Sequence, residues 1–274
     1  MSKAKLSPFI LCCMVFGFTF LYAPIVMLIV FSFNASKLVT VWGGFSTKWY
    51  FELMRDEQVL GAAYLSFKIA AINACASVVI GTMAAYALVR FGRFKGRAIM
   101  IQSISSRLVL PDVILGLSIL MLFVTLQSLI GWPAQRGVMT IIIAHVTFSS
   151  AYVAIVVQSR LAGLDRSFEE AAFDLGAGPF TVFRTVTLPM IAPSLVAGWL
   201  LAFILSFDDL VIASFASGPS STTLPMVIFS KVRLGINPEV NALATIIVFV
   251  VAVGVIFAGS LLQRQNDARM SGKP

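Results

Sequence analysis

The chain has 274 residues, of which 59% are hydrophobic and 12% are charged, and its mean hydropathy is +0.95. Soluble domains are about half apolar and a quarter charged, so this composition excludes an ordinary soluble protein and indicates one embedded in a membrane. The formal net charge of +8 would suggest nucleic acid as a partner of a soluble chain. Here the basic residues lie beside apolar runs, where they indicate orientation, and the sequence has no aromatic and basic patch for nucleic acid.

Six apolar segments are long enough to cross a bilayer as helices. A hydrocarbon core of about 30 Å needs about 20 apolar residues at a rise of about 1.5 Å each. We therefore predict an all-α membrane protein in which residues 1–274 form a single transmembrane domain. The predicted spans are residues 9–33, 61–89, 108–129, 138–157, 191–216 and 241–262.

The lysine and arginine residues predict which ends of the spans face the cytoplasm. Six spans place both termini on one side of the membrane, together with the loops at residues 90–97 and 158–190. That side carries 12 lysine and arginine residues, whereas the opposite side carries 6. Cytoplasmic segments are enriched in basic residues, so we predict that both termini and both of these loops are cytoplasmic.

A polar interruption precedes the third predicted span. The apolar stretch 98–129 is too long for one perpendicular span, and Arg107 and Pro111 interrupt it. We expect the part before the interruption to lie along the membrane surface or to pack obliquely. The carboxylate of Asp112 has two interpretations, which stay open here: it caps the helix that begins after Pro111, or it contacts cargo in a transport pathway.

No catalytic or metal site is predicted for this chain. The sequence contains no G-x-x-x-x-G-K-[ST] phosphate loop, no nucleophile with a base at usable spacing and no cysteine or histidine pattern for zinc. We therefore expect a partner protein to bind ATP and its magnesium ion. His145, the only histidine, lies in the middle of the fourth predicted span. We interpret it as a hydrogen-bonded structural residue rather than a proton relay.

The longest polar connection, residues 158–190, carries a spaced motif. Its members are Glu170, Ala171, Ala172, Gly176, Leu188 and Pro189. Glycine permits a turn that other residues disfavour, Pro179 suits the first turn of a second short helix, and Pro189 is expected to end that helix. The pattern therefore predicts a helix, a turn and a helix, with small side chains at the surface where another protein can approach closely.

This motif resembles the cytoplasmic signature loop of permease subunits of ATP-binding-cassette (ABC) importers. In that family the loop docks onto the ATPase, so the resemblance implies a coupling role for the six motif residues. The alternative is that Glu170 is a solvated surface charge and that Gly176 is an ordinary helix break.

Two adjacent carboxylates, Asp208 and Asp209, lie inside the fifth predicted span. One carboxylate in a span costs roughly 2.5–3.5 kcal/mol on insertion scales, so a pair indicates a function. We expect the pair to lie near the outer end of the span, where it can contact cargo. Adjacent helical residues point about 100° apart, so only one of them can face a pathway directly. The alternative is a structural ion pair with Lys68 or Arg107.

Several further segments are similar to the polyamine permeases of bacterial ABC importers, which carry putrescine and spermidine. The segments are FSTKWYFELMRDE, LPDVILGLSIL, AHVTFSSAYVA, LSFDDLVIASF, SGPSSTTLP and NPEVNALATI, and the likeness covers nearly the whole chain. The resemblance implies a type I importer fold in the bacterial inner membrane. It also implies a second homologous permease subunit, two ATPase subunits that bind ATP and magnesium, and a periplasmic polyamine-binding protein.

The sequence departs from this family at one position, and two other functions stay open. Relatives tend to carry an uncharged residue, often proline, where this chain has Arg107, and a cation there would repel a polycation or neutralise Asp112. The same ABC architecture could serve sulfate or ferric ion, because the signature loop does not specify the cargo. A proton-coupled secondary transporter with Asp208 and Asp209 as relays is the other alternative, but the signature loop argues against it.

Overall fold

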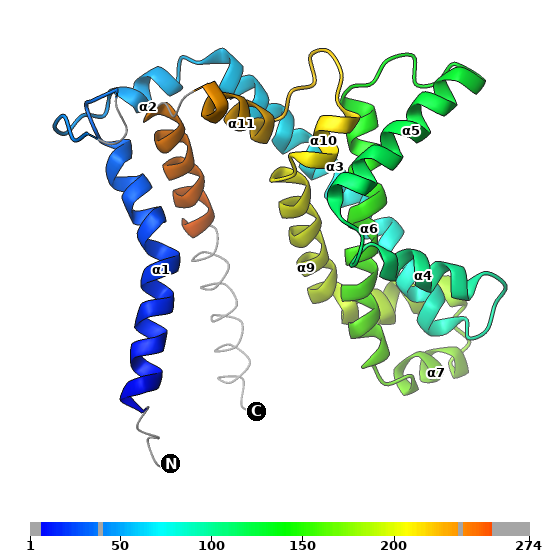
Figure 1. Ribbon diagram of the computed structural model, residues 1–274. Helices are drawn as coiled ribbons and strands as arrows, with labels where there is room; N and C mark the ends of the chain where they lie inside the picture. The colour runs from blue at the N-terminus through cyan, green and yellow to red at the C-terminus, as the bar shows by residue number, and fades with distance from the viewer. Residues whose placement is uncertain (1–6, 38–40, 235–237, 254–274) are drawn as a thin grey trace. The chain divides into compact units, whose positions relative to one another are not determined.

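The computed structural model describes residues 7–37, 41–234 and 238–253, and the regular elements in these residues are helices (Figure 1). The chain divides into two compact units. One unit draws on Met1–Leu60 and Ile228–Pro274, and the other is Gly61–Val227. Asp112, Asp208, Asp209 and the signature loop fall in the second unit.

The first unit contains α1 (Pro8–Ser32), α2 (Lys48–Leu53) and the helix Pro238–Val253. The apolar side chains of α1 are largely exposed, as expected for a helix that contacts lipid or another subunit. Buried Asn34 organises the loop after α1: its side-chain oxygen accepts hydrogen bonds from the backbone N–H groups of Ser36 and Gly43. These bonds tie Ser36 and Gly43 to the end of α1.

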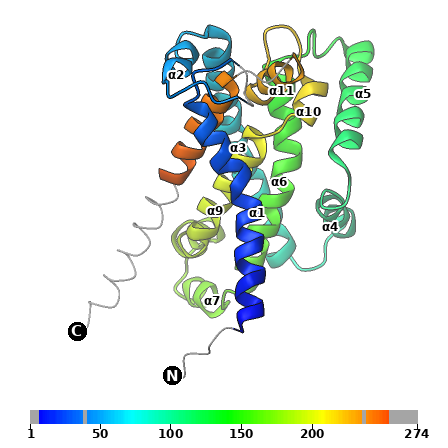
Figure 2. The same cartoon turned by 60° about the vertical axis from the view of Figure 1, so that its left-hand side comes forward.

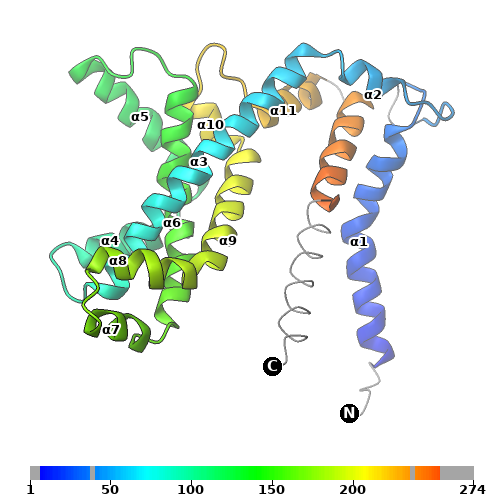
Figure 3. The same ribbon diagram turned by 180° about the vertical axis from the view of Figure 1, so that it is seen from behind.

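The second unit is built around two long helices that pack side by side, α6 (Val138–Ala162) and α9 (Leu188–Phe207) (Figures 1 and 3). Other helices lie wholly or partly in this unit. They are α3 (Glu57–Arg90), which begins in the first unit, α4 (Arg97–Ser106), α5 (Asp112–Ile130), α7 (Ser167–Asp174), α8 (Pro179–Val182), the π-helical turn η1 (Phe183–Thr187), α10 (Val211–Ala216) and α11 (Leu224–Leu234), which ends in the first unit.

Small and polar side chains allow α3, α6 and α9 to approach closely. A side-chain carbon at Gly81 would lie 2.7 Å from Cβ of Val153, so only glycine fits between α3 and α6 at this point. The side chain of Asn73 donates hydrogen bonds to Ser149 Oγ on α6 (3.1 Å) and to the Ala202 carbonyl on α9 (2.9 Å). These buried bonds fix the register of the three helices, because a shift would leave polar groups unpaired.

Five helices in the described residues are long and apolar enough to cross a membrane, which supports the prediction of an all-α membrane protein. They are Phe9–Ser32, Glu57–Arg90, Asp112–Ile130, Val138–Ala162 and Pro179–Phe207. The predicted sixth span, 241–262, begins within the helix Pro238–Val253, and its end lies outside the described residues. The number of spans and the cytoplasmic location of the termini stay predictions.

The helices differ from the predicted spans at two interruptions. The stretch 98–129 is split into α4 and α5, because extended Pro111 (ψ 142°) precedes the new helix at Asp112. The predicted span 191–216 is also not one helix: α9 ends at Phe207 and α10 begins at Val211. The assumption that Asp208 and Asp209 lie within a continuous helix is therefore wrong.

The expectation that Pro189 ends a short helix is also wrong. Helical structure continues from Pro179 through η1 to Phe207. Proline has no backbone N–H to bond the carbonyl four residues before it, which here belongs to Thr185, and η1 covers this position. The second helix of the signature loop is therefore the start of a transmembrane helix.

Candidate functional site

The break between α9 and α10 lies beside a pocket of about 300 Å³ that contains three carboxylates. The pocket is lined by Arg107, Asp112, Phe148, Leu205, Asp208, Asp209, Leu210 and Val211. All of these residues belong to the second unit. The structure thus brings together the three aspartates that the sequence indicated separately, and it adds Arg107 as a cation in the same site.

Asp209 is held by the protein itself. Its carboxylate accepts hydrogen bonds from the backbone N–H groups of Ile212 (3.3 Å) and Ala213 (2.6 Å), at the first turn of α10. Its Oδ2 also lies 3.2 Å from Nε2 of His145, and Nδ1 of His145 lies 2.6 Å from Ser206 Oγ. The expectation of a hydrogen-bonded His145 is confirmed, and the partner of Asp209 is this histidine rather than Lys68 or Arg107.

Asp208, in contrast, has an available carboxylate. It is the C-cap residue that follows the last residue of α9, and it is exposed at the pocket. Within the described part of the chain, no ion pair or hydrogen bond joins this carboxylate to another residue. The two adjacent aspartates therefore differ in kind: Asp209 shapes the chain at the break, and Asp208 presents a negative charge to the pocket.

Asp112 is neutralised in part by Arg107. Nη2 of Arg107 lies 2.8 Å from Oδ1 of Asp112, whose side chain keeps 56% of its surface exposed. Pro111 is the N-cap of α5, so the alternative in which the Asp112 side chain caps this helix is not found. Asp112 lies in the first turn instead, where the partial positive charge of the helix end favours a carboxylate.

The signature loop forms a separate feature at the end of the second unit opposite to α10 (Figures 1, 2 and 3). Helix α7 ends in a Schellman motif: the N–H of Ala177 bonds the Ala172 carbonyl, and the N–H of Gly176 bonds the Phe173 carbonyl. Gly176 has φ +81°, a conformation that side chains with a β-carbon disfavour. The predicted helix, turn and helix are therefore present, and the glycine makes the turn.

The six motif residues occupy two different places. Glu170, Ala171 and Gly176 are exposed on α7 and its turn, and Ala172 is half-buried. Leu188 instead packs against a buried apolar cluster that contains Ala85 and Val157, while Pro189 is exposed at the start of α9. The first four residues can therefore meet a partner directly, whereas Leu188 anchors the loop to the transmembrane helices.

The residue that fixes α7 in place is Glu169, which sequence reasoning missed. Its buried carboxylate lies 2.9 Å from Nε of Arg90 at the end of α3, and it accepts a 2.7 Å hydrogen bond from Thr187 Oγ1 in η1. The only sequence signal was the acidic pair of Glu169 and Glu170. Neither partner is near in the sequence, so nothing local distinguished the buried glutamate from the exposed one.

Large apolar side chains surround the exposed part of the signature loop. They are Phe168, Phe173, Leu175 and Phe180. Leu175 has 89% of its surface exposed, directly before the Gly176 turn. Apolar side chains of this size on a polar loop are typical of a surface that another protein covers.

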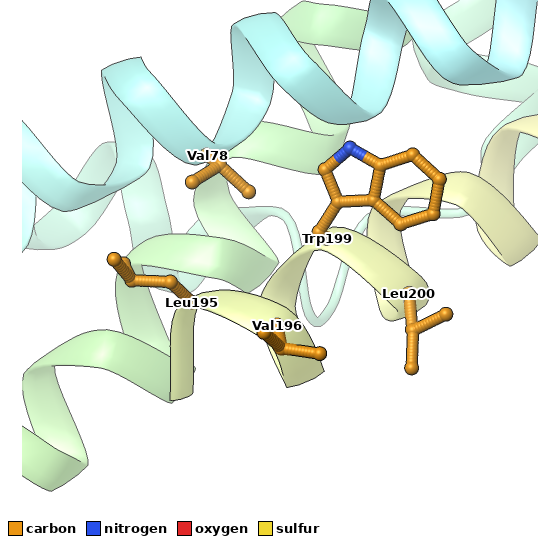
Figure 4. Close-up of a pocket in the computed structure, with 5 residues that line it drawn as sticks. All are labelled: Val78, Leu195, Val196, Trp199 and Leu200. Carbon is orange, nitrogen blue, oxygen red and sulfur yellow. The ribbon is translucent and has the colours of Figure 1, made fainter. Parts of the chain in front are cut away.

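A second hollow in this unit has a different chemistry. It is an apolar groove of about 500 Å³ between α3 and α9, lined by Val78, Leu195, Val196, Trp199 and Leu200 (Figure 4). No charged side chain lines it, so it offers nothing to balance the charge of an ionic cargo. The acidic pocket is therefore the better candidate for a cargo site. Among the described residues, no three or more His, Cys, Asp or Glu side chains are placed so that they could hold one metal ion.

Residues 77–272 match the protein family described as "Binding-protein-dependent transport system inner membrane component". The match covers more than half of the chain. The chain belongs to this family. It is therefore an inner-membrane component of a transporter rather than an enzyme, and the family membership does not favour a proton-coupled secondary transporter.

Curated members of this permease family are similar over nearly their full length. The Putrescine transport system permease protein PotI of Escherichia coli (strain K12) is 58% identical over 264 residues, 96% of this chain and 94% of that protein. The Spermidine/putrescine transport system permease protein PotC of the same strain is 40% identical over 255 residues, 93% of this chain and 94% of that protein. The resemblance to polyamine permeases is confirmed.

Solved structures agree on the fold. A bacterial ABC transporter involved in the import of the acidic polysaccharide alginate matches with a TM-score of 0.68 at 17% identity, covering 96% of this chain and 98% of that chain. The inward-facing MetNI methionine ABC transporter matches with a TM-score of 0.60 at 18% identity, covering 81% of this chain and 99% of that chain. The predicted ABC importer permease fold is therefore confirmed.

Proposed function

We propose that this chain is a permease subunit that imports putrescine or a closely related polyamine and provides half of the translocation pathway. The similarity to PotI and PotC supports a polyamine as the cargo, with the closer similarity to a putrescine permease. The observation that carries the proposal within the molecule is the pocket with three carboxylates at the break between α9 and α10.

The chemistry of this pocket suits an organic dication. A protonated diamine loses part of its hydration when it enters a membrane protein, and carboxylates replace the lost water contacts with charge-assisted hydrogen bonds. Asp208 is the residue best placed to contact an ammonium group, because its carboxylate has no other partner in the described chain. Asp209 positions the break, and Asp112 supplies a second carboxylate.

The signature loop is the proposed docking site for an ATPase. Glu170, Ala171, Ala172 and Gly176 lie at its exposed end, and Leu188 with Pro189 joins it to α9. We infer two ATPase subunits that bind ATP and magnesium, a second homologous permease subunit and a periplasmic polyamine-binding protein that delivers cargo. This composition is the one that the polyamine importer resemblance implies.

Helix α9 links the docking surface to the acidic pocket. It begins at Leu188, next to the signature loop, and ends at Phe207, next to Asp208. Its 20 residues span about 30 Å at a rise of about 1.5 Å per residue. A continuous helix moves as one piece, so a displacement of the loop by the ATPase reaches the break directly and changes access to the pocket.

Transport by the complete complex in liposomes tests this function. We expect uptake of labelled putrescine that requires internal ATP, and no uptake of labelled sulfate. Asp208→Asn should lower the uptake rate at a saturating concentration of the loaded receptor. Glu52→Gln, which neutralises an exposed carboxylate on α2, is the matched control and should leave the rate unchanged. Uptake of sulfate but not of diamines, or uptake without ATP, would refute the proposal.

A further inference from the structure

Arg107 places a cation inside the acidic pocket. It follows the last residue of α4, and its side chain is only 10% exposed. The guanidinium lies 2.8 Å from Oδ1 of Asp112 and 4.8 Å from the ring centre of Phe148, with the ring of Tyr152 at 5.8 Å. A carboxylate beside aromatic faces is a general arrangement for binding an organic cation.

The guanidinium of Arg107 makes fewer charged contacts than that of Arg90, whose side chain is also buried in this unit. Arg90 contacts the buried carboxylate of Glu169 through both Nε and Nη2. Arg107 contacts the exposed carboxylate of Asp112 through Nη2 alone, with a 3.5 Å contact from Nη1 to the Leu110 carbonyl. Its Nε is buried and has no hydrogen-bond partner in the described chain. Arg90 therefore holds α3 and α7 together through a buried ion pair. Moving the Arg107 side chain out of its position breaks fewer charged contacts and so costs less free energy.

We propose that Arg107 is a tethered competitor of the cargo: it occupies a subsite, formed by Asp112 and the ring of Phe148, that receives one ammonium group of a diamine. The inference rests on the proposed function and adds a residue that determines affinity. The second ammonium group is left to Asp208, which lines the same pocket and has no protein cation as a partner. A monoamine would therefore gain from only one of the two subsites.

The competition lowers the affinity of the pocket without removing its carboxylates. Cargo occupies both subsites only in those protein molecules whose Arg107 guanidinium has moved aside. The apparent Kd therefore equals the Kd of the open pocket divided by the fraction of protein molecules in which the subsite is open. If the subsite is open in about one molecule in ten, the apparent Kd is about tenfold higher than that of the open pocket. A permease gains from this arrangement because cargo that binds less tightly is released more readily to the cytoplasm.

Direct binding to the purified complex without its periplasmic receptor tests the inference, because the receptor has its own cargo site. We expect Arg107→Ala to lower the Kd for labelled putrescine about tenfold. Arg107→Lys keeps a tethered cation and should stay close to the wild type. Methylguanidinium at millimolar concentration should compete with putrescine in Arg107→Ala, where it fills the vacated subsite, and not in the wild type or in Arg107→Lys.

The outcomes separate this inference from the proposed function. An unchanged or higher Kd in an assembled Arg107→Ala complex, or no effect of methylguanidinium on it, overturns the role of Arg107 while putrescine uptake by the wild type still stands. Failure of the wild-type complex to take up any diamine overturns the proposed function itself. If Arg107→Ala does not assemble, Arg107→Gln serves as the second variant, with the same expected fall in Kd and the same result against it.

Discussion

The two ends of α9 use charge in opposite ways. At the signature loop, the charge of Glu169 is buried and paired with Arg90, and the exposed surface is rich in large apolar side chains such as Leu175. At the other end, the carboxylate of Asp208 bonds to no other residue of the described chain and lines a pocket. The first arrangement holds a surface in a fixed position for a protein partner, and the second offers charge to a small cation.

This difference shows why the two ends respond to different substitutions. Removal of one partner of the buried ion pair between Glu169 and Arg90 lowers the stability of the loop, because the other charge stays buried without a counter-charge. Removal of a charge from an open pocket affects the binding of a ligand and leaves the fold largely intact.

Glu169→Gln should have the largest effect, a loss of about 3–5 kcal/mol of stability, because it leaves the buried guanidinium of Arg90 without its counter-charge. The measurement is thermal unfolding of the purified complex, with assembly checked by size exclusion. Glu170→Gln is the matched control, since the neighbouring carboxylate is exposed and its loss should change stability by less than about 0.5 kcal/mol. Equal effects of the two substitutions would contradict the assigned difference between these glutamates.

Asp208→Asn should raise the Kd of the receptor-free complex for putrescine by about 10- to 100-fold, because a hydrogen bond to a charged group contributes about 1.5–3 kcal/mol. Equilibrium binding of labelled putrescine measures this change. Asp209→Asn should have a smaller direct effect on binding, since asparagine still accepts hydrogen bonds from the first turn of α10. A larger effect at Asp209 than at Asp208 would reverse the roles of the two residues.

Gly176→Ala should destabilise the turn after α7 by about 1–2 kcal/mol, because the left-handed conformation at φ +81° crowds a β-carbon. The expected result is a lower rate of ATP hydrolysis stimulated by the loaded receptor. Gly178→Ala is the control: this glycine has φ −70°, and a β-carbon there would have open space around it. The same loss of activity in both variants would remove the special role of the Gly176 turn.

The smallest effect is expected in the first unit, at the ion pair of Asp56 with Lys231 (2.5 Å). Burial opposes ionisation of Asp56, but the hydrogen bonds from Lys231 and from the Val59 N–H outweigh it and lower the pKa of Asp56. For Lys231, burial acts to lower the pKa. The hydrogen bonds to Asp56 and Glu239 outweigh this effect, so the pKa of Lys231 is raised. Each shift means that the folded state favours the charged form.

The directions of the two pKa shifts determine how the stability of the ion pair depends on pH. A lowered Asp56 pKa gives stability that is present above its unfolded value near 3.8 and is lost as the pH falls through the folded value. A raised Lys231 pKa gives stability that is present below its unfolded value near 10.5 and is lost as the pH rises through the folded value. We expect Asp56→Asn to remove up to about 1 kcal/mol at pH 7 and progressively less as the pH falls below 3.8, measured by thermal unfolding at pH 7 and at pH 3. An equal loss at both pH values would show that the charge is not involved.

The turn of the signature loop could be predicted from the sequence because its causes are local. Glycine at position 176 permits the left-handed turn, and Pro179 lies in the first turn of the helix that follows. The break at Asp208 and Asp209 could not be predicted in the same way. It depends on His145, which lies 64 residues away in the sequence, and on backbone groups of α10 that the sequence placed inside a longer helix.

Two further features also depended on contacts between distant segments. Glu169 is identical in type to its neighbour Glu170, and only the position of Arg90, 79 residues away, makes it a buried tie. A proline usually marks the end of a helix, but at Pro189 the π-helical turn η1 lets the chain continue in helical form. Residue types therefore predicted which segments matter, and the packing of α3, α6 and α9 decided what each residue does.

The most direct measurement compares variants at the two ends of α9 in one reconstituted complex, by receptor-stimulated ATP hydrolysis and by putrescine binding without the receptor. We expect Leu175→Asp, in the exposed apolar surface of the signature loop, to abolish most of the stimulated hydrolysis and to leave the Kd for putrescine unchanged. Asp208→Asn should raise that Kd and leave the ATPase attached. If both variants change the same quantity, or if neither changes either one, the division between a docking end and a cargo end is wrong.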